Sequence, residues 1–230
     1  MQERYLGDIH DFYKFLFIKH LASNLKVRIG LNWFLVDPKS ISNSELKKND
    51  GEKRSYLNNP KVTNLDEKLS SELSDLVKKK NRNLKNFTTK THLQKFVKFY
   101  NEKIMRNERK LWFENSINFF CKNEIIFLDP DNGILKRPNG RNSQKYVLLD
   151  ELKSYQSKGK IIIFTQFQSY NKSFFPYISE ITNFLKSNGL KIKYPVLRNR
   201  TSPNTFYITI GQDRIINSQR ILSVYKSYKK

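Results

Sequence analysis

An acidic loop that directly follows a short apolar run is the strongest candidate for chemistry in this sequence. Residues 125–128 read Ile-Ile-Phe-Leu, and residues 129–133 read Asp-Pro-Asp-Asn-Gly. All of these loop residues also favour turns, so a tight turn is the alternative interpretation. A polar side chain at the end of a buried strand has the rigid support that catalysis needs. We therefore select Asp129, Asp131 and Asn132 as candidate catalytic residues.

A second group of polar side chains lies in residues 7–14, which read Gly-Asp-Ile-His-Asp-Phe-Tyr-Lys. Asp8, Asp11 and Lys14 are spaced by three residues, which places them on one face of a helix. The same residues could equally be a capping aspartate followed by a solvated ion pair. Together with His10, they are candidates for binding a cofactor.

The apolar run at residues 30–36, Gly-Leu-Asn-Trp-Phe-Leu-Val, predicts a buried strand that ends in a turn. Ligands of open α/β sheets bind at the carboxyl ends of the strands, where the strand order reverses. Asp37, which directly follows this run, is therefore a candidate for binding a cofactor. Asp50 and Gly51 are further candidates, because they are the nearest approach to a glycine-containing loop after this strand.

Buried strands separated by helices must position these residues. Strands are expected, the first three side by side, at about 31–36, 124–128, 160–166, 191–199 and 205–211. This order predicts a three-layer, Rossmann-like α/β fold with a mostly parallel sheet and an antiparallel edge. Residues 7–14 and 129–133 should then line one pocket, although they are far apart in the sequence.

The helical patterns complete the expected organisation as a single domain, residues 1–230. Helices are expected at 8–24, 65–80, 91–120, 146–157, 174–188 and 213–228, because apolar residues recur at helical spacing or capping signals occur there. The second and third of these patterns suggest a basic helical insertion at about 65–120.

The charge of the chain favours a polyanionic partner. Forty-three Lys and Arg residues against 21 acidic residues give a net charge of +22. Residues 77–110 contain twelve basic and two acidic residues, with aromatic residues among them. Phosphate groups and base stacking suit such a surface, so we expect DNA or RNA to bind, with an affinity that falls steeply with salt. A Lys-rich composition without functional meaning is the alternative. The candidate contacts are Lys78, Lys79, Lys80, Arg82, Lys85, Lys95, Lys98, Arg198 and Arg200.

The sequence argues against several other classes of protein. A single cysteine excludes a disulfide framework, and the three His residues have no zinc-ligand spacing to it. The beginning of the chain does not read as a signal peptide, and no apolar run reaches the length of a membrane span. We therefore expect a cytoplasmic protein that does not enter a membrane; its oligomeric state is left open.

The two acidic motifs resemble those of the class I methyltransferases, most closely the bacterial 23S ribosomal RNA adenine-N6 methyltransferases. That family has a GNHADxxKH helix near its N-terminus and a DPPY-type loop after a later strand. Gly7, Asp11 and Lys14 match the first motif, and Asp129 and Pro130 match the second. The wider pattern, LGDxxDFxK followed by FLDPDNG, also resembles a group of uncharacterised bacterial proteins.

The chain departs from the methyltransferase pattern at several positions. Asp8 stands in place of an Asn, and His10 lies one position late. Asp131 and Asn132 replace the third and fourth residues of DPPY, so no aromatic residue follows the loop's proline. The loop after Asp37 lacks a glycine-rich signature, and the middle of the chain is short. An incomplete methyltransferase core is thus one expected form of the fold.

The resemblance implies an S-adenosylmethionine-dependent DNA or RNA methyltransferase, or a divergent relative. In that case Asp129 would accept a hydrogen bond from the amino group of a flipped base, and Asn132 could add an amide contact. Asp37 would meet the polar groups of the cofactor at the end of the first strand.

Two alternatives remain open. Pro130-Asp131 followed by Glu151-Leu152-Lys153 fits the PD-x19-ExK pattern of Mg²⁺-dependent nucleases, in which two carboxylates hold the metal and the lysine helps to activate water. That pattern requires ExK on a strand, whereas residues 146–157 predict a helix. A nucleic-acid-binding protein without catalytic activity is the other alternative.

Overall fold

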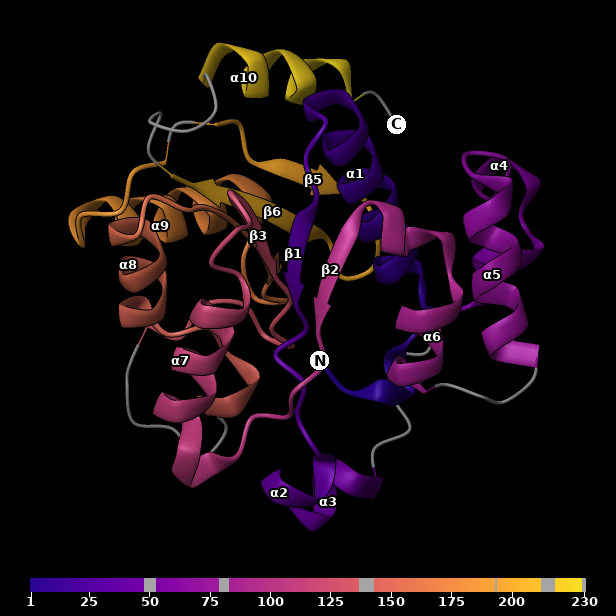
Figure 1. Ribbon diagram of the computed structural model, residues 1–230, viewed down its shortest axis with the longest axis horizontal. Helices are drawn as coiled ribbons and strands as arrows, with labels where there is room; N and C mark the ends of the chain where they lie inside the picture. Colours follow the sequence, from indigo (N-terminus) through magenta and orange to yellow (C-terminus); the bar gives the residue numbers. More distant parts are fainter. Residues whose placement is uncertain (48–52, 79–82, 137–142, 193, 212–217, 229–230) are drawn as a thin grey trace.

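The fold is a six-stranded sheet between two layers of helices (Figure 1). The computed structural model describes all residues except 48–52, 79–82, 137–142, 193, 212–217 and 229–230. The strands of the sheet are β1 (Ile29–Asn32), β2 (Val97–Tyr100), β3 (Ile125–Leu128), β4 (Ile161–Phe167), β5 (Leu197–Asn199) and β6 (Thr205–Ile210).

The strands lie in the order β2-β1-β3-β4-β6-β5. β2, β1, β3 and β4 are mutually parallel, whereas β6 is antiparallel to both of its neighbours, β4 and β5. The chain leaves β1 for β2 on one side and then returns to β3 on the other side. The strand order therefore reverses between β1 and β3, which is where open α/β sheets bind their ligands.

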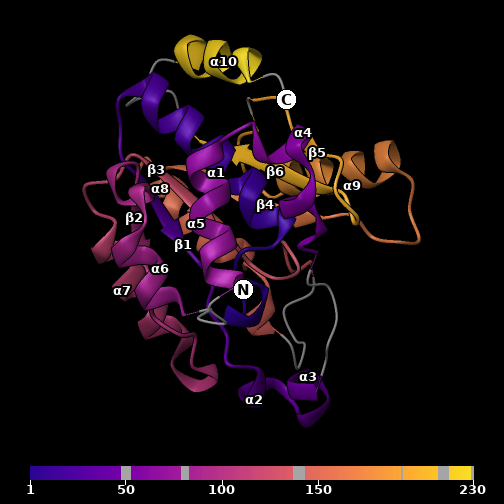
Figure 2. The same cartoon turned by 90° about the vertical axis from the view of Figure 1, so that its right-hand side faces the viewer.

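Helices cover both faces of this sheet (Figures 1 and 2). Side chains alternate between the faces along a strand, so Ile125 and Phe127 belong to one apolar cluster while Ile126 and Leu128 belong to the other. The first cluster includes side chains from α1, α5, α6 and α10, and the second includes side chains from α7, α8 and α9. The helices are α1 (Ile9–Leu25), α2 (Pro38–Ile41), α3 (Asn43–Lys47), α4 (Pro60–Thr63), α5 (Glu67–Lys78), α6 (Leu84–Lys90), α7 (Arg109–Phe119), α8 (Leu149–Ser157), α9 (Phe174–Ser187) and α10 (Ser218–Ser227).

Much of this architecture agrees with the sequence-based expectation. The three expected apolar strands are β1, β3 and β4, and they lie side by side in a mostly parallel sheet with antiparallel pairing at one end. The helix expected at 174–188 is α9, and Gly189 follows it with a φ of +83°, as expected for a residue just past a helix end.

Three expected elements were wrong in type or extent. Residues 97–100 form the edge strand β2 inside the segment expected to be a helical insertion. β1 ends at Asn32, because Phe34 adopts a positive φ of 49° that interrupts an extended strand. Only the last three residues of the expected strand at 191–199 form β5.

Among the helices of the described residues, none combines the length and the apolar character needed for a membrane crossing.

Candidate functional site

The candidate site begins at the point where the strand order reverses. The backbone N–H of Asp129 donates a hydrogen bond of 2.9 Å to the carbonyl of Asn32, so the end of β3 is fixed against the end of β1. Asp129 is 7% exposed, and its carboxylate accepts a hydrogen bond of 3.0 Å from the hydroxyl of Thr165 on β4. Three neighbouring strands therefore determine where this carboxylate lies.

The beginning of α1 lies over the same strand ends. Asp8 caps the helix, and its side chain accepts hydrogen bonds of 2.9 Å from the backbone N–H groups of His10 and Asp11. The other carboxylate, Asp11, accepts a hydrogen bond of 2.8 Å from the N–H of Gly7. Because α1 is buried along much of its length, its polar side chains need partners inside the protein.

Lys14 is the partner that joins the two segments. Its Nζ lies 2.5 Å from Oδ1 of Asp11 and 2.6 Å from Oδ2 of Asp129, a residue 115 positions away in the sequence. The lysine is 3% exposed, and the ring of Trp33 lies beneath its ammonium at 4.6 Å. Asp11, Lys14 and Asp129 therefore form a continuous buried ionic chain, which we call the Lys14 cluster.

Burial shifts the pKa values of Asp8 and of two members of the Lys14 cluster, Asp11 and Lys14. Burial raises the pKa of Asp8 well above its usual value, and the charge of Asp11 raises it further. Burial also raises the pKa of Asp11, although Lys14 offsets part of the effect. Burial opposes the charge on Lys14, but Asp11 and Asp129 together raise its pKa and keep it protonated. Burial therefore favours the protonated, neutral form of Asp8 and Asp11, whereas Lys14 keeps its charge.

A cavity of about 560 Å³ opens directly above the Lys14 cluster. This volume is in the range of small-molecule sites. The residues that line it include Asp8, His10, Asp11, Lys14, Asp129, Pro130, Asp131, Asn132, Lys145, Tyr146, Thr165, Gln166, Phe167, Tyr170, Tyr177, Thr205 and Tyr207. The expectation that segments 7–14 and 129–133 line one pocket therefore agrees with the structure.

His10 forms part of the wall of the cavity. Its ring lies edge-on to Phe167 at 5.2 Å, and its Nδ1 lies 2.8 Å from the hydroxyl of Thr205 on β6. Burial, followed by the charges of Lys53 and Lys14, lowers the pKa of His10 from 6.5 to about 4. The ring is therefore neutral at physiological pH.

This neutral histidine should make the stability of the fold depend on pH. The unfolded chain takes up a proton near pH 6.5, whereas the folded state does so only near pH 4. The contribution of His10 is therefore complete above pH 6.5 and is lost as the pH falls towards 4. Between pH 7 and pH 4.5, we expect the free energy of unfolding to fall by about 1–2 kcal/mol more in the wild type than in His10→Gln, as measured in urea. Equal losses in both proteins would contradict this assignment.

Gln166, a lining residue that sequence reasoning missed, connects separate parts of the cavity wall. Its Oε1 accepts a hydrogen bond of 2.9 Å from the N–H of Ile134, and its Nε2 donates one of 2.6 Å to the hydroxyl of Tyr177. Gly133 has a φ of +84°, and a Cβ atom there would lie 2.2 Å from Oε1 of Gln166. The available signal was the pair Thr165–Gln166, which interrupts an otherwise apolar strand.

Asp131 is held in a second buried network. Its Oδ1 lies 2.9 Å from the amino group of Met1, and its Oδ2 accepts a hydrogen bond of 3.1 Å from Gln2. Gln2 also donates to Glu45, which accepts a hydrogen bond of 2.8 Å from Lys145. Asp131 therefore stabilises the loop at residues 129–133, and it also lines the cavity. Glu45 and Lys145 were not identified from the sequence.

The expected cofactor contact of Asp37 does not agree with the structure. This residue caps α2 by accepting a hydrogen bond of 3.0 Å from the N–H of Lys39, and it lies 3.7 Å from Lys103 in an exposed ion pair. It is not among the described residues that line the cavity, because β1 ends five residues before it. Asp50 and Gly51 lie outside the described residues.

The residues of the nuclease pattern are also placed differently from its requirement. Glu151 and Lys153 lie on helix α8 rather than on a strand. The carboxylate of Glu151 is buried and engaged by Arg109, at 2.7 and 2.9 Å, and by the N–H of Leu148. Within the described residues, no group of His, Cys, Asp and Glu side chains is arranged to hold a metal ion. Asp131 and Glu151 are each engaged by other partners, Asp131 by Met1 and Gln2 and Glu151 by Arg109.

The predicted nucleic-acid contacts are found in different surroundings. Lys85, Lys95, Arg198 and Arg200 are exposed, whereas Lys98 donates a hydrogen bond of 2.6 Å to the carbonyl of Phe119. Lys98 therefore supports the end of α7 instead of being freely available to a phosphate. Lys79, Lys80 and Arg82, together with the side chain of Lys78, lie outside the described part of the chain.

Searches against protein-family models, curated proteins and solved structures gave no match to this chain. The function must therefore be argued from the site itself.

Proposed function

We propose that the chain is an S-adenosylmethionine-dependent nucleic-acid methyltransferase, or a divergent relative of one. One observation carries the proposal: the carboxylate of Asp129 is held by Lys14 and Thr165 on the floor of a cavity where the strand order reverses. A rigid carboxylate in this position can receive and orient an amino group. The mixed sheet with its antiparallel closing strands is also the architecture that the resemblance to class I methyltransferases implies.

The carboxyl groups of the cavity floor could receive part of this cofactor. S-adenosylmethionine supplies an electrophilic methyl group when bound, and it carries a sulfonium, an ammonium and a carboxylate group. Asp8, Asp11 and Asp129 offer carboxyl oxygens to the ammonium group of such a ligand, and a bound cation would in turn favour the ionised form of Asp8 and Asp11, whose pKa values burial raises. Asp8, Asp11 and the neutral ring of His10 are the residues that would hold the cofactor.

The chain's own groups also suit a nucleobase. Asp129 would accept a hydrogen bond from an exocyclic amino group, and Asn132, which lines the cavity, could contact the edge of the same base. The DPDN loop lacks the aromatic residue of DPPY-type loops, but Phe167, Tyr146 and Tyr170 line the same cavity and could supply the stacking surface. The net charge of +22 favours a polyanion as the substrate.

The test is a melting curve of the full chain with S-adenosylmethionine, compared with Mg²⁺ alone, followed by transfer of labelled methyl groups to bulk RNA and DNA. Binding to the folded state should raise the melting temperature by a few degrees at saturating cofactor. Stabilisation by Mg²⁺ alone together with cleavage of nucleic acid would favour the nuclease alternative. Binding of nucleic acid with neither effect would favour a protein without catalytic activity.

A further inference from the structure

A second cavity, of about 720 Å³, lies beside the candidate site. It is lined by Tyr13, Phe174, Phe175, Arg198, Arg200 and Tyr228, with Leu197 and Asn199 between them. Two arginines and four aromatic residues line it, and no acidic residue is among its described lining. We call this surface the aromatic–arginine surface. Its composition matches that of proteins that bind single-stranded nucleic acids by stacking and phosphate contacts.

Arg198 and the rings of the aromatic–arginine surface contact one another. The guanidinium of Arg198 lies 4.4 Å from the ring centre of Phe174, and the ring of Phe174 is 4.6 Å from that of Phe175. Phe174 also packs on Phe206 in the core at 5.5 Å, which anchors the arrangement. Phe175 is 79% exposed, so its ring is available to a partner. The exposed ring of Phe175 therefore lies against Phe174, whose ring contacts both the guanidinium of Arg198 and the core.

The two cavities are adjacent in the fold. His10 and Tyr13 are one turn apart on α1; His10 lines the candidate site, and Tyr13 lines the second cavity. The segment before β6 contributes to both cavities, since Arg200 lines the second cavity and Pro203 and Thr205 line the candidate site. It is joined to the end of β4, because the N–H of Gln168 donates a hydrogen bond of 2.9 Å to the carbonyl of Asn204. The side chains of Gln168 and Asn204 are also joined at 2.6 Å. A strand lying on the aromatic–arginine surface would therefore reach the candidate site by following this segment.

We propose that the aromatic–arginine surface holds the single strand that flanks a target nucleotide, with the target itself in the cavity above Asp129. This inference rests on the proposed function for its target nucleotide, but the surface is argued from its own residues. Single-stranded nucleic acid is favoured over a duplex because stacking on Phe175 requires an unpaired base face. The arginines carry the charge that phosphates require.

Fluorescence anisotropy with a labelled single-stranded RNA, the same sequence as DNA, and the corresponding duplexes tests the surface. Phe175→Ala should weaken binding of the single strands about 5- to 20-fold. Phe175→Trp should restore binding, and Phe175→Leu should not, because leucine is apolar but cannot stack. Leu111→Ala, at another exposed apolar side chain, should change binding less than twofold.

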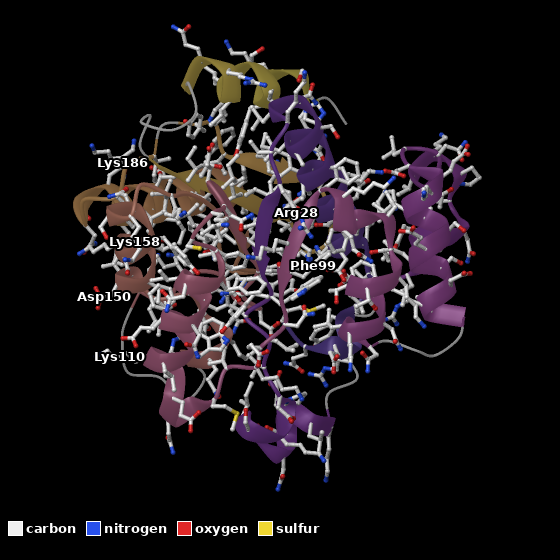
Figure 3. The ribbon with its side chains drawn as sticks, viewed as in Figure 1. Arg28, Phe99, Lys110, Asp150, Lys158 and Lys186 are labelled. Atoms are coloured by element: carbon white, nitrogen blue, oxygen red, sulfur yellow. The ribbon has the colours of Figure 1, made fainter. Side chains whose placement is uncertain are left out.

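The salt dependence tests the arginines. The plot of log affinity against log salt concentration has a negative slope. Arg198→Ala combined with Arg200→Ala should reduce the magnitude of this slope by about 1.4, because two phosphate contacts to a single strand are lost. The matched control combines Lys158→Ala with Lys186→Ala, two exposed lysines just past α8 and near the end of α9 (Figure 3), and should leave the slope unchanged. Equal effects of both double variants, or preferred binding of the duplexes, would overturn the proposal.

Failure of the surface and failure of the proposed function give different results. If S-adenosylmethionine raises the melting temperature but the Phe175 and arginine variants bind as the wild type does, the surface is wrong and the function stands. If S-adenosylmethionine does not raise the melting temperature of the wild type, while these substitutions weaken single-strand binding as expected, the surface stands and the methyltransferase assignment is wrong.

Discussion

Asp129→Asn should lower the rate of methyl transfer at least a hundredfold while changing the free energy of unfolding by no more than about 2 kcal/mol. Loss of one preorganised polar contact to a reacting group has consequences of this order in other enzymes. The fold should tolerate the change, because Asn retains an oxygen for the hydroxyl of Thr165, and Lys14 keeps Asp11 as its partner. Removal of the charge also relieves its repulsion with the carboxylate of Asp11.

The measurement pairs a urea unfolding curve with labelled methyl transfer to bulk nucleic acid. Asp150→Asn is the matched control, since this carboxylate is exposed at the beginning of α8 (Figure 3). It should alter neither quantity appreciably. If Asp129→Asn unfolds early and retains its activity, Asp129 has a structural role only, and our assignment of the site is wrong.

Lys14→Met should have the largest effect on stability, a loss of about 3–5 kcal/mol at pH 7. Methionine fills a similar volume but leaves the carboxylates of Asp11 and Asp129 without their buried cation, and breaking a buried ion pair in this way is strongly destabilising. Lys103→Met is the matched control. Its partner is Asp37, the side chains are 49% and 42% exposed, and the expected cost is below about 1 kcal/mol.

The pH dependence of Lys14→Met separates this charge effect from a loss of packing. Burial raises the folded-state pKa of Asp8 and Asp11 above 3.8, the value expected in an unfolded chain. Lys14 lowers the pKa of both carboxyl groups, so its removal should raise these pKa values further, and the folded variant should take up protons at a higher pH than the folded wild type does. The variant should therefore regain stability relative to the wild type as the pH falls from 7 to 5. Urea unfolding at the two pH values measures the difference. A loss that is the same at both would show that packing, rather than charge, determines the cost.

The sequence predicted those parts of the fold and site that local patterns determine. The apolar run before Asp129 could only be a buried strand, and the capping aspartate followed by an apolar helix identified α1. The convergence of the two acidic segments followed from the rule that ligands bind at the carboxyl ends of parallel strands. Applying that rule requires only the order of helices and strands along the chain, and the pattern of apolar residues predicts this order.

Contacts between distant residues were beyond such reasoning. Nothing local identifies Lys145 as the partner of Glu45, 100 residues away, or shows that Asp131 contacts the first two residues of the chain. The edge strand β2 was missed because its apolar residues continue the spacing of the neighbouring helical pattern. Pairing with β1, rather than the local sequence, makes it a strand.

The position of β6 between β4 and β5 has a consequence for how the protein is synthesised. β5 pairs with β6 and not with β4, so it has no partner in the sheet until the ribosome has added residues 205–210. Until then β4 presents an unpaired edge, which can associate with other chains. The same late residues bring Thr205 and Tyr207 to the cavity. A nascent chain that stalls before Ile210 would therefore be prone to aggregation and would lack a complete site.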